Sequence, residues 1–457
     1  MSRNFAISIV QTLRQRGFQA YLVGGCVRDL LLKREPADFD VATSATPAQV
    51  MDIFPDTYAV GAQFGVVLVP LPEDQRASTG NFTAQANAVE VATFRSDLGH
   101  SDGRHPDEVR FTQDPREDAA RRDFTINGMM LHPFGGERKG EMPGEVLDSV
   151  GGQNDLHARI IRAIGDPQRR FAEDKLRMLR AVRFAARFEY AIEAETLAAI
   201  ERLAPKIHVV SRERVRDELT KMLTEGHARR AFLLLDETGL LKEVLPEISK
   251  MKGVQQPPEF HPEGDVFAHT LLLLENLPHP CPPTLAWGAL LHDVGKPATF
   301  RVAPDRIRFD NHVDIGVKIA EEICERLRFS KHDAAQVLAL VDNHMRFGHV
   351  TRMKESTLKK FLRLPGFDEH LALHRADSLA SHRNLNTYHF LQNKLTEIPP
   401  ENIRPAALIT GDDLIAAGYL PGPRFREILE AVEDAQLEGR LLSRNAAIEY
   451  VGREFPL

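Results

Sequence analysis

One stretch near the N-terminus, YLVGGCVRDLLLKREPADFDVAT at residues 21–43, constrains the chain more than any other. A short apolar run at 20–23 predicts a buried strand, and residues 27–32 predict a helix soon after it. Gly24 and Gly25 between them let the backbone approach an anion closely, and the N–H groups at a helix start favour phosphate. Arg28, in the first helical turn, adds a charged donor. The stretch therefore predicts a phosphate cradle.

Two carboxylates follow the cradle. Asp38 and Asp40 open a second predicted strand, in which alternate side chains point to the same face. Two carboxylates on one face, beside a phosphate cradle, can hold Mg²⁺ against a triphosphate. A lone Gly-Gly turn or a lone D-x-D is usually an ordinary turn or strand end, so the prediction depends on the two occurring together.

Composition narrows the class of protein. The length of 457 residues predicts two to four domains, and 43% hydrophobic with 27% charged residues is typical of a soluble globular chain. No apolar run is long enough to span a membrane and no signal peptide is evident, so we expect a cytoplasmic protein. The three cysteines form no spaced set, which argues against a disulfide framework or zinc motif. A net charge of −7 argues against nucleic-acid binding by bulk charge, but not through a local basic face.

Three further segments complete the N-terminal region. Residues 88–95 alternate like a strand, where Glu90 is either a third metal carboxylate or a solvent-facing residue. Residues 72–86 and 96–107 are rich in turn residues without periodicity, so we expect loops there. A glycine-rich hairpin over 134–150 is expected to close the region.

A charged helix is predicted to begin near residue 166. Asp174, Arg177, Arg180 and Arg183 follow at spacings of three and four, so Asp174 and Arg177 would be neighbours on its surface. The pair is either an exposed ion pair of little energy or a base-reading pair. A carboxylate accepts and a guanidinium donates hydrogen bonds, which complements the pairing edges of cytosine and adenine but not of guanine or uracil. The later arginines could bind triphosphate or primer phosphates.

The first stretch resembles the signature of class II tRNA nucleotidyltransferases and bacterial poly(A) polymerases, G-G-x-V-R-D followed by D-x-D-x-x-T. Arg122, Asp123 and Asn127 lie in RRDFTINGMM, which is similar to the family motif R-R-D-F-T-I-N-A except for Gly128. The resemblance implies that Arg122 meets the triphosphate and Asp123 the ribose. It also implies that the E-D-x-x-R motif ending at Arg177 selects the base without a nucleic-acid template.

The C-terminal half resembles HD-domain metal-dependent phosphohydrolases, whose pattern is a His, a His-Asp dyad and a distant Asp. The residues that match this pattern are His269, His292, Asp293 and Asp377. The resemblance implies a divalent metal, of a kind that the sequence does not identify, bound by these four residues. His312 and His344 lie where members with two metals place extra ligands, and Lys296 could meet a phosphate.

The resemblance implies an α+β fold whose polymerase-beta-like nucleotidyltransferase head has a small mixed sheet plus helices. An all-helical neck, HD body and tail would follow. The implied domains are the head over 1–152, a helical neck over 153–225, a helical body with the HD domain over 226–385 and a helical tail over 386–457. Basic segments at 207–223 and 350–364 would either contact RNA phosphates or form solvated helix faces.

The implied activity is addition of C and A from CTP and ATP to the 3′ end of tRNA, with release of pyrophosphate. Gly24, Gly25 and Arg28 would hold phosphates, and Asp38 and Asp40 would hold Mg²⁺. Addition of CC only, of A only, or of a poly(A) tail is the close alternative. The HD site, with phosphohydrolysis of an RNA end, could instead be the main activity beside a degenerate head, or the HD domain could mainly position tRNA. A non-catalytic RNA-binding protein is a third class, and the sequence does not predict the oligomeric state.

Overall fold

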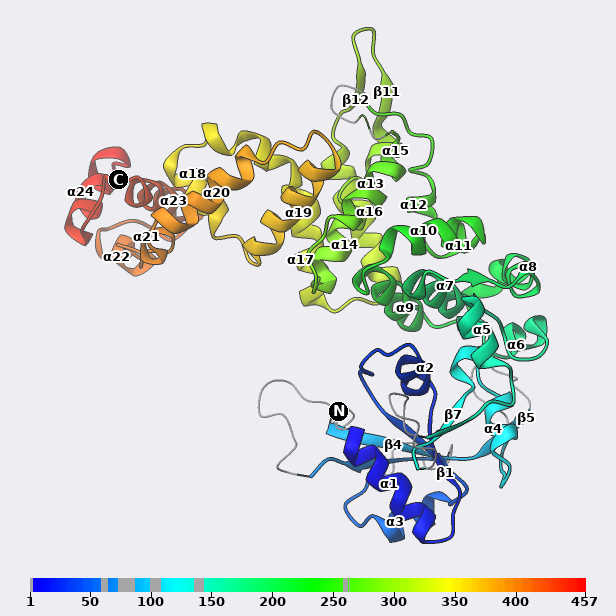
Figure 1. Cartoon of the computed structure of the whole chain (residues 1–457). Helices are drawn as coiled ribbons and strands as arrows, with labels where there is room; N and C mark the ends of the chain where they lie inside the picture. The colour runs from blue at the N-terminus through cyan, green and yellow to red at the C-terminus, as the bar shows by residue number, and fades with distance from the viewer. Residues whose placement is uncertain are drawn as a thin grey trace. The chain divides into compact units, whose positions relative to one another are not determined.

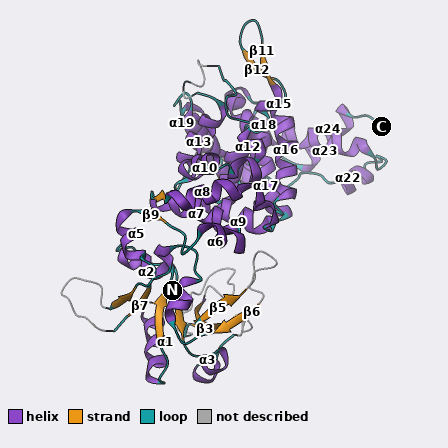
Figure 2. Ribbon diagram, turned by 90° about the vertical axis from the view of Figure 1, so that its right-hand side faces the viewer, coloured by secondary structure: helices purple, strands orange, loops and turns teal. Residues whose placement is uncertain are grey.

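The computed structural model describes residues 3–58, 65–72, 87–98, 108–134, 144–257, 262 and 264–457 (Figure 1). The chain divides into two compact units, residues 1–246 and 247–457. Strands are concentrated at the start of the first unit, and most of the remaining described chain is helical (Figure 2). None of the described helices combines the length and apolar character needed to cross a bilayer.

A six-stranded sheet organises the first unit, in the order β3-β4-β2-β1-β7-β8. Strands β2 and β4 are parallel and the other pairs are antiparallel, so the predicted small mixed sheet is confirmed. The strand bounds are β1 Ala20–Val23, β2 Asp40–Thr43, β3 Val66–Pro70, β4 Ala88–Thr93, β7 Met130–His132 and β8 Glu145–Leu147. Helix α1 (Arg3–Gln15) packs on β1 and β2 through buried Ile9, Val10 and Leu13.

Short helices around this sheet position the polar residues. Gly24 has φ 76°, a conformation that glycine adopts readily, and it turns the chain from β1 into α2 (Gly25–Leu31). Helix α3 (Pro47–Ile53) begins with a capping box between Thr46 and Gln49. Helix α4 (Pro115–Ala120) and the 3₁₀ helix η4 (Thr125–Asn127) lead into β7.

Helices complete the first unit after the sheet. Their bounds are α5 Gly152–Ala158, α6 Pro167–Glu173, α7 Leu176–Phe188, α8 Ala194–Leu203, η5 Ala204–Val209, α9 Arg212–Thr224, α10 Ala228–Glu237 and α11 Leu240–Val244. A two-residue parallel pair, β9 (Ile160–Ile161) with β10 (Ala191–Ile192), lies among them, so the expectation of an all-helical neck over 153–225 is wrong at this point. Helix α7 contacts both α9 and α10.

The prediction of one continuous helix from residue 166 through residue 187 is wrong. Asp166 caps α6 as expected, but α6 ends at Glu173, and Asp174 has the extended conformation φ −141°, ψ 106°. The Oδ1 atom of Asp174 accepts a hydrogen bond from Leu176 N at 3.0 Å, which starts a second helix, α7. Asp174 therefore competes with the helical backbone, as aspartate does at helix starts.

Helices build most of the second unit. Their bounds are α13 Val266–Glu275, α14 Pro283–Leu291, α15 Lys296–Thr299, α16 His312–Arg326, α17 Lys331–Asn343, η6 His344–Arg352, α18 Glu355–Leu362, α19 Phe367–Ala380, α20 Asn386–Glu397, α21 Pro400–Ile403, α22 Gly411–Ala416, α23 Pro423–Leu437 and α24 Arg444–Glu454. The expectation of an all-helical body misses one hairpin, β11 (Phe300–Val302) with β12 (Ile307–Phe309). Helix α12 (Pro246–Ser249) lies at the boundary of the two units.

Three sequence predictions fall wholly or partly outside the described residues. Most of the loop expected at 72–86 lies outside the described residues, and the centre of the hairpin expected at 134–150 lies outside them too. That hairpin pairs β8 with β7, which lies before residue 134. The loop predicted at 96–107 is wrong at its start, because β5 (Arg95–Leu98) pairs with β6 (Glu108–Phe111).

The basic segment at 350–364 makes contacts that the sequence did not predict. Lys359 Nζ donates to Leu437 O at 2.6 Å, Lys360 Nζ pairs with Asp434 at 2.7 Å, and Arg363 pairs with Glu433 at 2.5 Å. These cations thus attach α18 to α23. These three side chains therefore form neither a free RNA-binding face nor a solvated helix face, which were the two alternatives that the sequence left open.

Candidate functional site

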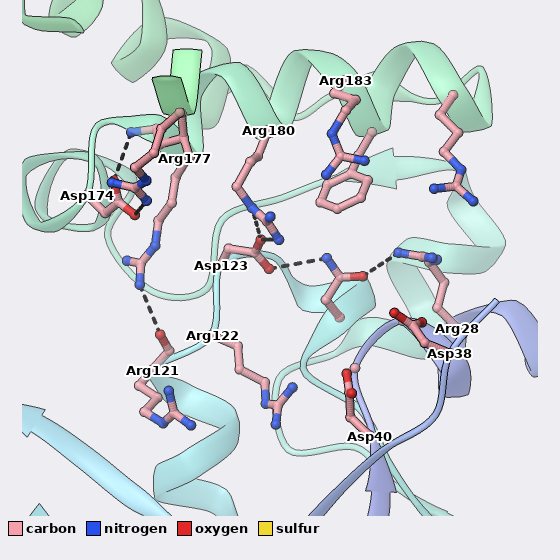
Figure 3. Close-up of a pocket in the computed structure, with 17 residues that line it drawn as sticks. Arg28, Asp38, Asp40, Arg121, Arg122, Asp123, Asp174, Arg177, Arg180 and Arg183 are labelled. Atoms are coloured by element: carbon pink, nitrogen blue, oxygen red, sulfur yellow. Dashed lines mark hydrogen bonds and ion pairs between the residues drawn. The ribbon is translucent and has the colours of Figure 1, made fainter. Parts of the chain in front are cut away.

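A pocket of about 480 Å³ opens in the first unit between α2, the start of β2 and α7 (Figure 3). Every predicted head residue except Glu90 lines it, although these residues are spread over about 160 positions of the chain. The predicted residues that line it are Gly24, Gly25, Arg28, Asp38, Asp40, Arg122, Asp123, Asn127, Asp174, Arg177, Arg180 and Arg183. The fold thus brings the predicted set together.

Positive charge dominates the pocket. Its lining contains eight arginines and four aspartates. The arginines are Arg28, Arg121, Arg122, Arg177, Arg180, Arg183, Arg187 and Arg214. Because guanidinium groups bind phosphate oxygens with charge-assisted hydrogen bonds, the pocket suits a ligand that carries several negative charges.

The two carboxylates of the first stretch enter the pocket from the start of β2. Asp38 lies in the loop before the strand, which begins only at Asp40, so the predicted strand start is wrong by two residues. Phe39 between them is fully buried and anchors the segment. Asp38 and Asp40 nevertheless line the same pocket, at the foot of the view in Figure 3.

Ionisation is disfavoured at the cluster formed by Asp38, Asp40 and Glu90, in spite of the arginines elsewhere in the pocket. Burial, reinforced by Glu90 and Asp38, raises the pKa of Asp40 to about 7. Glu90 lies opposite Asp40 in the register of β2 and β4, and it is exposed, as the solvent-facing alternative predicted. Partial desolvation, reinforced by Asp38, nevertheless raises the pKa of Glu90. A cluster of oxygen ligands whose ionisation is suppressed fits a hard divalent cation, which would relieve this repulsion. Glu90 does not line the pocket, but it belongs electrostatically to this cluster.

A chain of hydrogen bonds orders the middle of the pocket. Arg28, which is 4% exposed, donates from Nη1 to Asn127 Oδ1 at 2.7 Å. Asn127 Nδ2 donates to Asp123 Oδ1 at 3.2 Å, and Arg180 donates to Asp123 Oδ2 at 2.6 and 2.9 Å (Figure 3). Burial alone would raise the pKa of Asp123, but the Arg180 guanidinium holds it below its usual value. The chain therefore fixes an ionised carboxylate between α2, η4 and α7.

Asp174 and Arg177 line the same pocket, but in the part of the chain that the structure describes their side chains bond to other residues and not to each other. Asp174 Oδ2 accepts from Arg214 Nη2 of α9 at 2.8 Å. Arg177 donates from Nη1 to Glu173 Oε2 at 3.1 Å and from Nη2 to Arg121 O at 3.2 Å. The predicted surface pair is absent because the chain breaks its helical course at Asp174.

Arg214 is a pocket residue whose role the sequence did not indicate. It stood among several basic residues of a predicted helix, and its partner Asp174 lies 40 positions earlier. Arg183 also differs from expectation. It is 5% exposed, and it donates to Glu218 Oε2 at 2.6 Å and lies over the Phe184 ring at 4.3 Å. It therefore supports the pocket wall.

The second unit gathers all the predicted HD residues. His269 lies on α13, His292 and Asp293 directly follow α14, and Asp377 lies on α19. His312 and His344 begin α16 and η6. They form two groups, His269 with His292 and Asp377, and Asp293 with His312 and His344, and within each group the possible ligand atoms lie within 4.8 Å of one another.

Backbone carbonyls orient three of the imidazoles. The Nδ1 atoms of His292, His312 and His344 lie 2.8, 2.9 and 2.6 Å from the carbonyl oxygens of Ala289, Phe309 and Val341. Because a carbonyl oxygen only accepts, each Nδ1 carries a proton and each ring presents Nε2, the other possible ligand atom, to the cluster. Burial lowers the pKa of His344 to about 4, which keeps it neutral. This arrangement fits a divalent metal.

Lys296 supports the cluster instead of projecting freely from it. Its Nζ lies 2.7 Å from Asp293 Oδ2 and 2.7 Å from Gln256 Oε1. Burial would raise the pKa of Asp293, but His292 and Lys296 hold it well below its usual value. Asp293 therefore stays an ionised ligand.

The first prediction concerns the carboxylate cluster. We expect Asp40→Asn to raise the melting temperature of the metal-free chain at pH 8 and to raise it by a smaller amount at pH 5. Since the folded-state pKa of Asp40 lies above its unfolded value, the folded chain keeps this proton longer and loses stability as the pH rises from about 4 to about 7. Differential scanning calorimetry at both pH values measures this. Asp52→Asn, at an exposed position of α3, is the control, and equal shifts at both pH values would contradict the account.

Three models of known protein families match successive parts of the chain. Residues 20–162 match the model of the poly A polymerase head domain. Residues 189–252 match that of the probable RNA and SrmB-binding site of polymerase A, and residues 266–380 match that of the HD domain.

Curated relatives are similar over part of the chain. The CCA-adding enzyme of Geobacillus sp. (strain WCH70) is 41% identical over 235 residues, which are 51% of this chain and 53% of the relative. That of Lactobacillus johnsonii is 36% identical over 282 residues, which are 60% of this chain and 65% of the relative. The chain thus spans about half of the length of the first and somewhat less than two thirds of the second.

Solved structures are similar over nearly the whole chain. The crystal structure of the Bacillus stearothermophilus CCA-adding enzyme in complex with CTP superposes with a TM-score of 0.73 at 27% identity, covering 99% of this chain and 98% of that one. The Thermotoga maritima CCA-adding enzyme complexed with tRNA_CCA shares the fold, with a TM-score of 0.57 at 18% identity over 98% of this chain and 94% of that one. The chain thus carries a poly A polymerase head domain, a region that matches the probable RNA-binding site of polymerase A, and an HD domain, and it shares its fold with CCA-adding enzymes.

Proposed function

We propose that the chain is a template-independent RNA nucleotidyltransferase that adds C and A from CTP and ATP to the 3′ end of tRNA and releases pyrophosphate. One observation carries the proposal. A single pocket combines Asp38 and Asp40 with Asp174 and with eight arginines, one of which is Arg177. The naming of the similar proteins as CCA-adding enzymes, one of them in complex with CTP, supports it.

The proposed chemistry divides between the carboxylates and the arginines. Asp38 and Asp40, with Glu90 beside them, would hold Mg²⁺, which when bound lowers the pKa of the RNA 3′-hydroxyl and neutralises leaving charge. Arg28 and Arg122 would bind the triphosphate oxygens. The RNA 3′-oxygen forms a bond to the α-phosphorus as the bond to pyrophosphate breaks.

Base selection follows from the donor and acceptor chemistry of the opposite wall. Asp174, held by Arg214, would accept from the exocyclic amine of cytosine or adenine. Arg177 would donate to the adjacent ring nitrogen, because a guanidinium has five N–H donors and its contacts to Glu173 and Arg121 leave some of them available. Guanine and uracil present a donor and an acceptor in the reverse order.

The extension of defined RNAs tests the proposal. We expect the purified chain with Mg²⁺ to add C twice and A once to tRNA transcripts that end before CCA, and to leave an unstructured RNA unextended. Transcripts that end after C and after CC, each offered the four NTPs singly, resolve the steps. Asp40→Asn is the inactive control and Asp52→Asn the matched active one.

Other outcomes of the extension assay would change the assignment. Addition of CC alone or of A alone would make the chain one partner of a divided reaction, and a long A tail on unstructured RNA would make it a poly(A) polymerase. No extension of any RNA would contradict the proposal.

Arg214 provides the next prediction. We expect Arg214→Ala to lower the preference for CTP over UTP, measured as the ratio of kcat/KM values, by about tenfold or more, because it removes a charge-assisted bond that orients Asp174. Arg214→Lys should restore part of the preference. Arg216→Ala is the matched control, since Arg216 lies on the same helix, pairs with Asp217 at 2.8 Å and is not among the residues that line the pocket. An unchanged preference in Arg214→Ala would remove Arg214 from base selection.

We also propose a second function, metal-dependent phosphohydrolysis at the HD cluster, because two groups of three possible ligands converge there with their imidazoles oriented. On an Asp40→Asn background, His344→Ala should weaken binding of Mn²⁺ by about tenfold or more and should reduce phosphate-ester hydrolysis. His332→Ala, whose side chain is 93% exposed, should change neither. Unchanged titration calorimetry in His344→Ala would contradict a metal site here.

A further inference from the structure

The β11–β12 hairpin lies between two sets of cluster residues. It follows α15, which begins at Lys296, the residue that pairs with Asp293. After β12 the chain passes through Asn311, in the left-handed region at φ 60°, directly to His312 of the cluster. Both ends of the hairpin are therefore connected in the chain to residues of the histidine–aspartate cluster, and the hairpin projects beyond α15 in both views (Figures 1 and 2).

The hairpin forms one wall of a cavity of about 350 Å³ above the cluster. Five cluster residues line this cavity: His292, Asp293, His312, His344 and Asp377. The hairpin contributes residues 306–310 to this lining, and Pro257, Lys296 and Met345 complete it. The volume is at the lower end of the range of about 300–1,000 Å³ for small-ligand sites, which suits a single nucleotide-sized group.

The hairpin wall presents one readily available cation. Arg301 pairs with Asp310 at 2.7 Å and Arg308 pairs with Asp305 at 2.8 Å. Arg306 Nε lies 4.0 Å from the nearest carboxylate oxygen, on Asp305, and its side chain is 55% exposed. Since Lys296 already bonds to two acceptors, Arg306 is the cation of this cavity that is least engaged within the chain.

The same wall also has an aromatic surface. Phe309 lines the cavity, its ring centroid lies 6.0 Å from that of Phe300, and Lys296 Nζ lies 5.3 Å from the Phe309 ring centroid. Ile307 continues this surface, and Met345, beside His344, is 54% exposed. A cluster of metal ligands on one side and an apolar aromatic wall on the other fit a phosphate ester whose alcohol carries a flat base.

We propose that residues 306–309 are the substrate-recognition wall of the HD centre. Arg306 binds phosphate oxygens and Phe309 packs against the base of a nucleoside phosphate, whether at an RNA end or in a free nucleotide. The inference rests on the proposed phosphohydrolase function. In the reaction a water oxygen forms a bond to phosphorus, the bond from phosphorus to the ester oxygen breaks, and the released alcohol takes up a proton from water.

Paired substrates test the wall. The Mn²⁺-loaded full chain, on the Asp40→Asn background, is offered adenosine 3′-monophosphate and glycerol 2-phosphate, which lacks a base. We expect Phe309→Ala to raise KM for the nucleotide about tenfold with little change in kcat, and to leave glycerol 2-phosphate unaffected. Arg306→Ala should raise KM for both. Val302→Ala is the matched control, because Val302 lies on the same hairpin, is 72% exposed and is not among the residues that line the cavity.

Limited trypsin digestion gives a readout that is independent of turnover. Trypsin cleaves after Arg301, Arg306 and Arg308, and mass spectrometry locates each cut. The digestion is carried out with Mn²⁺ on the His292→Ala variant, which prevents turnover, and in parallel on the chain with His292 intact. In both, adenosine 3′-monophosphate should slow cleavage after Arg306 more than glycerol 2-phosphate does. Titration calorimetry should show unchanged Mn²⁺ binding in Phe309→Ala and Arg306→Ala.

The outcomes separate this inference from the function on which it rests. If the wild-type centre hydrolyses no ester, the phosphohydrolase function fails. If it hydrolyses esters but Phe309→Ala raises KM equally for both substrates or for neither, or if the nucleotide gives no protection after Arg306, the recognition wall is wrong. A lower KM for an RNA that ends in a 3′-phosphate than for the free nucleotide would support the wall and identify RNA ends as the source, and equal values would support it with free nucleotides.

Discussion

The ion pair between Asp123 and Arg180 is the interaction on which the arginine-rich pocket of the first unit depends. Two hydrogen bonds of 2.6 and 2.9 Å join η4, beside the sheet, to α7. Through Asn127 the same carboxylate is connected to Arg28 in the turn after β1. Together with the hydrogen bond from Arg177 to Arg121 O, the pair holds the carboxylates at the start of β2 and the proposed base-reading residues on facing walls of one pocket. Loss of the pair would remove two of the bonds that fix the distance between these walls.

Both sites are preorganised, because contacts within the chain already orient their charged and polar groups. In the first unit the arginines outnumber the aspartates, and the acids near Asp40 resist ionisation, so a triphosphate with its cation would balance both excesses. In the second unit, backbone carbonyls fix the protons on Nδ1 and leave Nε2 for the cluster. Arg183 instead makes a hydrogen bond to Glu218, and Lys296 helps to keep Asp293 ionised.

The sequence predicted what depends on short-range order. The strand, glycine turn and helix at 20–31 follow from such local patterns. The mixed sheet and the HD residues, which the resemblance to known families implied, also appear in the structure. It did not predict the break at Asp174, because helical spacing on both sides concealed a cap at the junction. Nor did it predict the partners of Arg214 or Lys360, since ion pairs between distant elements leave no periodic signal. The hairpin at 300–309 was missed because its two strands are only three residues long.

The central claim is that protein side chains select the incoming base, and removal of one atom group from the nucleotide tests it most directly. CTP and its analogue without the 4-amino group are compared in single-turnover addition to tRNA by the wild-type chain and by Asp174→Ala. If Asp174 accepts a hydrogen bond from the amine, loss of the amino group slows the wild-type chain by about tenfold or more and has little further effect in Asp174→Ala. Equal penalties in both chains would contradict base reading by Asp174.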